Sequence, residues 1–175
     1  MAAKNSAELS PCSVPSEGPA VDAVADEIVE GVLRTSRALV AVAARSLAGV
    51  ADDVTLGQYR LLVVLAARGP QRMVDLADAL AMLPSTATRM CDRLVGKGLI
   101  SRARPSDDRR AVVLTLAPAG RRLIEDVTRR RREEIREILT RVPHESHAGL
   151  IRSFLAFADA AGEIGDQEWL WQIAE

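Results

Sequence analysis

The segment LISRARPSDDRRAVVLTLA, residues 99–117, constrains the fold more than any other part of the chain. Both of its ends are apolar, and Val112, Leu114 and Leu116 share one face of the second end, as in a strand with one buried side. The middle, PSDDRR, has the composition of a turn and carries four charges. Two short strands with a charged tip between them predict a β-hairpin that is anchored in a core and projects from it.

Two short helices are predicted immediately before this hairpin. Residues 73–80 have an apolar face at helical spacing, and Pro84 suits the first position of a second helix that stops at Gly96 and Gly98. At 100° per residue, the apolar and polar side chains of the second helix point in opposite directions. The apolar set is Ala87, Met90, Cys91 and Leu94, and the polar set is Ser85, Thr88, Arg89 and Asp92. Two helices joined in this way and followed at once by a β-hairpin form a winged helix.

Longer helices are predicted on both sides of this lobe. Apolar residues recur at helical spacing over 21–47, and such a helix is about 40 Å long, which favours a second chain as its neighbour. Thr55 and Gln58 form a capping-box pattern, and the apolar helix that follows ends at Gly69 and should lie in the core. A last helix is predicted from about Ser146 to Ala160. The fold class is therefore mainly α with a small β-hairpin wing (α+β).

These elements give a single domain at 20–161. Its winged helix-turn-helix spans about 55–117, and dimerisation helices lie at about 21–47 and 118–160. Residues 1–19 are rich in Ser, Pro and Ala, which predicts a disordered tail, and residues 162–175 form a C-terminal tail that contains Trp169 and Trp171. The sequence leaves open whether these tryptophans pack back onto the domain.

Charge is distributed unevenly along the chain. The net charge is −1, but residues 68–110 carry +4 and residues 111–136 carry +3, between a net −4 over residues 1–57 and a net −5 over the last 39 residues. A positive middle indicates a face for an anionic partner, although charge alone also fits a solvated surface. Aromatic residues make up only 3%, which disfavours single-stranded nucleic acid as that partner.

Other classes of protein find little support. No GxSxG, P-loop or glycine-rich dinucleotide motif occurs, so we expect neither an enzyme nor a cofactor. No apolar run approaches the ~20 residues of a membrane span, and the N-terminus lacks the pattern of a signal peptide, so we expect a cytoplasmic protein with no membrane contact.

Two sensor chemistries remain as alternatives. His144 and His147, with Glu145 between them, could bind a metal, but such a pair more often simply begins a helix, and we expect no metal site. Cys12 falls in the predicted tail, whereas Cys91 faces the core, where thiols are usually inert. A winged helix that contacts only protein is a further alternative to one that binds DNA.

The chain closely resembles the MarR family of transcription regulators from about residue 24 to residue 160. The resemblance is strongest in STATRMCDRLVGKGLISRARPSDDRRAVVLTLAPAGRRL, where several motifs fall where the family has them. These are Thr88–Arg89, Asp92–Leu94, Gly98–Ile100, Asp108, Arg110 and Pro118–Gly120. One departure is Ala117, where family members commonly carry Thr, a residue that can cap the following helix.

The resemblance implies a homodimer with intertwined terminal helices, whose two winged-helix lobes bind a palindromic operator in double-stranded DNA. It further implies a repressor that a small-molecule effector releases from DNA. The residues that bind an effector stay unknown from the sequence. Tyr59 is the one phenol of the core region that could orient such a ligand, and a packed tyrosine is the alternative.

Residue roles on the second helix follow from chemistry. Ser85 and Thr86, at its N-terminus, should bind a phosphate with the help of the helix dipole. Thr88 and Arg89 should read base edges, since Arg can bridge O6 and N7 of guanine, unless Arg89 is an exposed arginine paired with Asp92. Asp92 would repel phosphate and is interpreted as a brace.

The wing should add further contacts. Arg109 is expected to enter the minor groove, while Asp108 braces Arg110 across the tip. Arg102 and Arg104 should contact phosphates, with a solvated face as the alternative. The full predicted DNA-binding set is Ser85, Thr86, Thr88, Arg89, Arg93, Arg102, Arg104, Arg109 and Arg110.

The run Arg129–Arg132 invites an assignment to DNA, but its setting favours another interpretation. Glu133 and Glu134 follow four residues after Arg129 and Arg130, so i,i+4 pairs on a solvated helix surface are expected.

Overall fold

The computed structural model describes residues 19–103 and 112–163. The chain divides into two units, residues 1–39 and 40–175, and the first helix, α1 (Pro19–Ala48), contributes to both. The predicted tail at 1–19 lies outside the described residues except for Pro19, and so do Trp169 and Trp171 of the C-terminal tail. Helix α1 confirms the helix predicted at 21–47. Within the first unit, it exposes several large apolar side chains, namely Ile28, Val29, Leu33 and Leu39.

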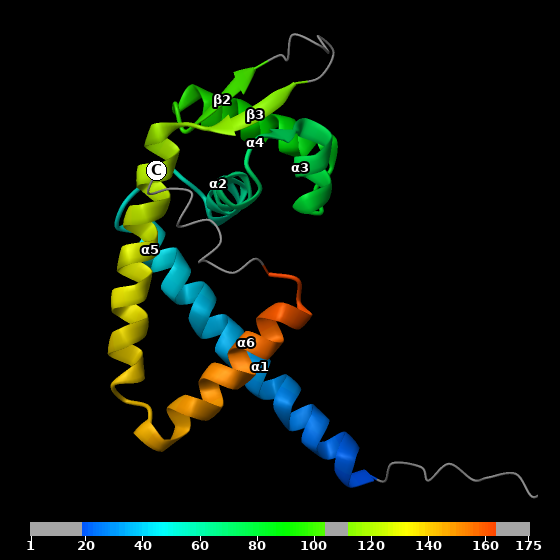
Figure 1. Cartoon of the computed structure of the whole chain (residues 1–175), viewed down its shortest axis with the longest axis vertical. Coiled ribbons are helices and arrows are strands. Elements are labelled where there is room, and N and C mark those ends of the chain that lie inside the picture. Colours follow the sequence, from blue (N-terminus) through cyan, green and yellow to red (C-terminus); the bar gives the residue numbers. More distant parts are fainter. Residues whose placement is uncertain (1–18, 104–111, 164–175) are drawn as a thin grey trace, which may run out of the picture. The chain divides into compact units, whose positions relative to one another are not determined.

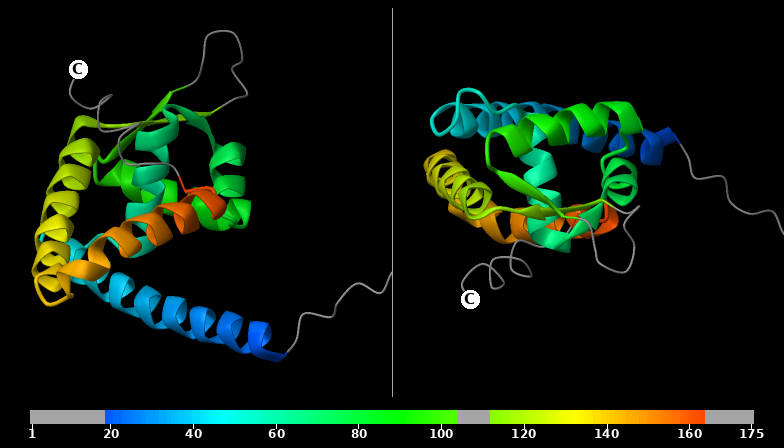
Figure 2. Two further views of the ribbon diagram at one scale, coloured as in Figure 1. Left: turned by 60° about the horizontal axis from the view of Figure 1, so that its bottom comes forward. Right: turned by 90° about the horizontal axis from the view of Figure 1, so that it is seen from above.

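The second unit is built around α2 (Leu56–Arg68), as predicted. The capping box is present: the Thr55 hydroxyl accepts from the Gln58 N–H at 3.3 Å, and the Gln58 side chain accepts from the Thr55 N–H at 3.0 Å. Leu61 and Leu62 are fully buried. In both views of Figure 2, α2 lies between the later helix α5 on one side and α3 on the other. The helix ends at Gly69, whose φ of +70° suits glycine.

Helices α3 (Met73–Ala79) and α4 (Pro84–Gly96) form the predicted helix-turn-helix. Pro84 is the first residue of α4, and Ala87, Cys91 and Leu94 are fully buried on its inner side. Met90 is partly buried against the same core. The polar face of α4 is exposed as predicted, and Gly98 adopts the positive φ that turns the chain toward the hairpin.

A three-stranded antiparallel sheet with the order β1-β3-β2 completes the lobe. Figure 1 shows its two longer strands, β2 and β3, side by side. The strands β2 (Ile100–Ala103) and β3 (Val113–Leu116) confirm the predicted hairpin, and Ile100 and Leu114 are buried in it. Strand β1 (Gln71–Arg72) was not predicted; it pairs with β3 so that Arg72 lies opposite Val113. Two residues are too few to show the alternation that identifies a strand.

Helix α5 (Pro118–Leu139) returns along the core, and Leu123, Ile124 and Val127 bury its inner face. A short 3₁₀ turn, His144–Ser146, leads into α6 (His147–Ala160), close to the predicted last helix. Helix α6 buries no side chain fully and leaves four large apolar ones exposed: Ile151, Phe154, Leu155 and Phe157. Within the described residues, no helix combines the length and apolar character needed to cross a membrane.

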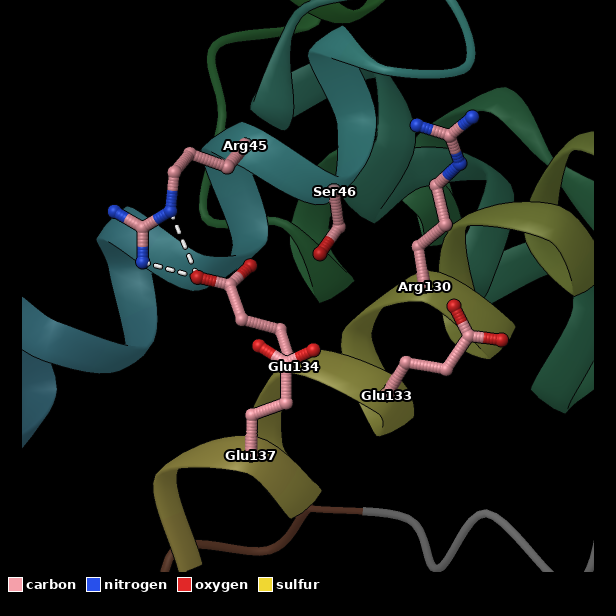
Figure 3. A pocket seen from close by; sticks show the side chains of 6 residues that line it. All are labelled: Arg45, Ser46, Arg130, Glu133, Glu134 and Glu137. Carbon is pink, nitrogen blue, oxygen red and sulfur yellow. Dashed lines mark hydrogen bonds and ion pairs between the residues drawn. The ribbon is translucent and has the colours of Figure 1, made fainter. Parts of the chain in front are cut away.

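The ion pairs predicted along α5 are wrong. Arg129 donates to Asp126 at 2.6 Å rather than to Glu133, and Glu134 accepts from Arg45 Nε at 2.8 Å rather than pairing with Arg130. Figure 3 shows the Arg130 guanidinium pointing away from Glu134, in a hollow of about 430 Å³. The physical reason is that the last turns of α1 bring a closer cation to Glu134 than its own helix does.

Candidate nucleic-acid interface

The exposed face of α4 carries most of the predicted contacts. Ser85, Thr86, Thr88, Arg89 and Arg93 are all exposed. The Thr88 hydroxyl donates to the Pro84 carbonyl at 2.9 Å, so its proton is used within the helix. The hydroxyl oxygen can still accept, and the side-chain methyl stays available for apolar contact. Thr88 is therefore chemically suited to the amino group of adenine or cytosine, or to the methyl group of thymine.

Arg89 does not make the ion pair that was its alternative. Asp92 accepts instead from Arg102 Nη2 on β2, at 2.7 Å. Among the described residues, no hydrogen bond or ion pair holds the Arg89 guanidinium, so its five N–H donors are available to a ligand. This arrangement leaves the cation on the outer face of α4 and neutralises the nearest carboxylate.

The Asp92–Arg102 pair also connects α4 to the wing. Asp92 acts as a brace, as predicted, and its partner is a residue for which we expected a phosphate contact. Both side chains are partly exposed, so the pair is open to exchange with an anion from outside. The pair is one contact that links β2 to α4.

The base of the wing is packed against the start of α5. The Ala117 N–H donates to the Leu99 carbonyl at 3.0 Å, and Gly120 is buried beside that carbonyl. Ala117 caps α5 with no side-chain hydrogen bond. The tip itself, with Arg104, Asp108, Arg109 and Arg110, lies outside the described residues, and its roles stay predictions.

Cys91 has the properties of an inert core thiol. Its side chain is fully buried, and this burial is the main reason that its pKa is raised to about 11. The charge of Arg102 lowers the pKa of the thiol slightly, and the charge of Asp92 raises it slightly. Such a thiol carries very little thiolate at neutral pH. The other cysteine, Cys12, lies outside the described residues.

His144 begins the 3₁₀ turn and His147 begins α6. The centres of their rings lie 5.0 Å apart, and the ring planes are tilted by 43°. Across residues 19–103 and 112–163, no set of three His, Cys, Asp or Glu side chains is gathered as metal coordination would require.

A cavity of about 360 Å³ lies between α2, α5 and the end of α1. Tyr59 in its wall is buried, its hydroxyl lies 3.5 Å from the Thr128 hydroxyl, and the Arg131 guanidinium sits 5.5 Å from the centre of its ring. At the rim, Arg60 holds Glu163 through two hydrogen bonds of 2.7 and 2.8 Å. The sequence pointed to Tyr59 for such a site but missed the two arginines and Glu163, because their proximity depends on three separate elements.

Comparison with known proteins agrees with this geometry. The sequence model of the MarR family matches residues 54–112, from the start of α2 to the wing. The transcriptional regulator FarR of Neisseria gonorrhoeae is 34% identical over 92 residues, which cover 51% of this chain and 63% of FarR. The chain thus matches a little under two thirds of the length of this curated relative.

Solved structures extend the similarity beyond the winged helix. RV1404 from Mycobacterium tuberculosis is 39% identical, with a TM-score of 0.76 over 81% of this chain and 97% of RV1404. NadR, solved in complex with 4-hydroxyphenylacetate, is 26% identical, with a TM-score of 0.56 over 84% of this chain and 96% of NadR. Matches at this level in the winged lobe and across the flanking helices show that the chain belongs to the MarR family of transcription regulators.

Proposed function

We propose that this protein is a sequence-specific regulator that binds double-stranded DNA through α4 and the wing. The observation that carries this proposal is the exposed face of α4, where Arg89 has no hydrogen-bond or ion-pair partner among the described residues while Asp92 is neutralised by Arg102. A free arginine on a helix next to a wing is suited to guanine in the major groove. A winged helix that serves only as a protein contact would not need this cation held free.

The test is selection of bound duplexes from a random pool, followed by titration of the selected operator. We expect Arg89→Ala to cost about 1–3 kcal/mol per half-site and to relax base preference at one position. Arg109→Ala should instead lower the salt dependence by about one unit per subunit. Arg141→Ala removes an exposed arginine beyond α5 and serves as the control. If both interface variants bind as the wild type does, the DNA-contact assignment is wrong.

We also propose a homodimer that binds a palindromic operator. Its support is the apolar surface that α1 and α6 leave exposed, because single-chain proteins rarely leave such patches uncovered. Half-sites should then be about one helical turn, roughly 10 bp, apart. A monomeric mass at micromolar concentration, with the helices intact by circular dichroism, would contradict the dimer.

We propose finally that the regulator is a repressor and that a small molecule in the cavity beside Tyr59 releases it from DNA. The cavity supports this because it combines an apolar wall with a few converging polar groups. NadR, a structural relative, is known with 4-hydroxyphenylacetate bound. In vitro transcription from the selected operator, with and without a panel of aromatic acids, tests both parts of the proposal.

A further inference from the structure

The cavity beside Tyr59 already contains a carboxylate from the chain itself. Glu163 follows the end of α6 and reaches Arg60 in the first turns of α2, 103 residues earlier. The two terminal guanidinium nitrogens of Arg60, Nη1 and Nη2, each donate to one carboxylate oxygen of Glu163, a two-point geometry that is frequent between arginine and carboxylates. Arg60 and Glu163 both line the cavity, so this contact occupies its rim.

The charged part of the lining is mainly cationic. Among the described residues that line the cavity there are three arginines, Arg60, Arg131 and Arg132, and one carboxylate, Glu163. The Nε of Arg131 is buried and makes no hydrogen bond with any described residue. The pKa of Glu163 is lowered, mainly by the hydrogen bonds from Arg60 and further by Arg68, despite some burial. The end of the cavity at Arg60 therefore favours a negative charge.

The apolar part of the cavity suits the body of an organic acid. Leu56, Val63 and Ile135 line it, and the Tyr59 ring closes one side. An inorganic anion would leave this apolar surface uncovered, whereas a carboxylate on an aromatic or aliphatic body would use both parts.

We propose that Glu163 is an internal occupant of an anion subsite on Arg60, and that a carboxylate-bearing apolar ligand enters this cavity by displacing it. The inference rests on the proposed effector-responsive function and identifies its competitor within the chain. Glu163 and Arg60 are each about half exposed, so their contact is an exchangeable surface pair rather than a fixed core contact. For exposed ion pairs of this kind, the paired state is roughly two- to five-fold more populated than the unpaired state. Because a ligand must bind the unpaired state, removing the Glu163 carboxylate should tighten ligand binding about three- to six-fold.

The experiment measures binding of 1-naphthoate and of its neutral analogue, 1-naphthamide, to the full chain by calorimetry without DNA. Glu163→Gln should tighten naphthoate about three- to six-fold and leave naphthamide within two-fold of the wild type. Arg60→Gln should remove the preference for the acid over the amide. Asp75→Asn is the matched control, because Asp75 also accepts two hydrogen bonds from one arginine, Arg72, but does not line the cavity.

Unchanged naphthoate affinity in Glu163→Gln, an equal gain for both probes, or no binding of either probe to any variant would each overturn the inference. Glu163→Ala, checked for fold by circular dichroism, repeats the test without the amide side chain of Gln. Because DNA is absent, failure of operator binding would count against the proposed function alone. Loss of the Glu163 effect in a chain that still binds operator would count against this inference alone.

Discussion

Gly120 lies where α5 starts against the base of the wing, and alanine at this position should loosen both. A Cβ built on Gly120 would fall well inside van der Waals contact with the Leu99 carbonyl oxygen and 2.8 Å from Cδ1 of Leu116. The leucine side chain can rotate, but the carbonyl belongs to the backbone and accepts the hydrogen bond from Ala117. Relief therefore requires α5 to move away from the start of β2.

The size of the effect follows from three contributions. Forcing a methyl group into a packed site costs roughly 1–3 kcal/mol, and losing the Ala117–Leu99 hydrogen bond costs roughly 0.5–1.5 kcal/mol. The higher helix propensity of alanine returns up to about 1 kcal/mol. We expect Gly120→Ala to lower the free energy of unfolding by about 2 kcal/mol per subunit.

Urea unfolding at one fixed protein concentration measures this change, since the stability of the proposed dimer would depend on concentration. Gly96→Ala is the matched control: Gly96 is also helical, but its added Cβ meets nothing within 4 Å. That variant should be as stable as the wild type or up to about 1 kcal/mol more stable. Equal stability of the Gly120 and Gly96 variants would refute the argument that the Leu99 carbonyl limits this position.

Three further predictions concern single side chains. Ala117→Thr should stabilise each subunit by about 1 kcal/mol in the same urea assay, because the hydroxyl can cap α5, and should leave operator affinity unchanged. The pKa of Asp53 is lowered, chiefly by a hydrogen bond from Lys97, so this pair stabilises the fold above the ordinary Asp pKa and ceases to do so as the pH falls through the lowered value. Between about pH 5 and pH 3, the free energy of unfolding should therefore fall less steeply in Asp53→Asn than in the wild type. Identical pH profiles for the two proteins would contradict this prediction. Cys91 should resist iodoacetamide at pH 8 in the folded protein and react in urea, since roughly a thousandth of a thiol with a pKa of about 11 is ionised at that pH. Peptide-resolved mass spectrometry distinguishes its reaction from that of Cys12.

The features that the sequence predicted correctly are those encoded within a few residues. The capping box of Thr55 and Gln58, Pro84 at the start of α4 and the end of that helix at Gly96 are local, and each sets an element boundary. The two faces of α4 followed from periodicity alone, because its inner residues had to meet one core.

The features that could not be predicted are contacts between elements. Strand β1 exists only because β3 pairs with it, and the sequence of its two residues does not indicate this pairing. The same holds for the ion pairs: spacing on α5 suggested a partner for Glu134 on its own helix, whereas Arg45 comes from α1. Arg60 and Glu163 meet only after α2, α5 and α6 have been placed.

The pairing of β1 with β3 determines when during synthesis the lobe can take its final form. Gln71 lies opposite Leu114, so the pairing closes a loop of more than forty residues that contains α3 and α4. Because β3 is the middle strand, it must be present before either neighbour has a partner. The helices can form early from local contacts, but the sheet waits for this distant closure. On the ribosome, we therefore expect α4 to emerge well before it is locked in place, and the nascent chain to become competent for DNA only once Leu116 has left the exit tunnel.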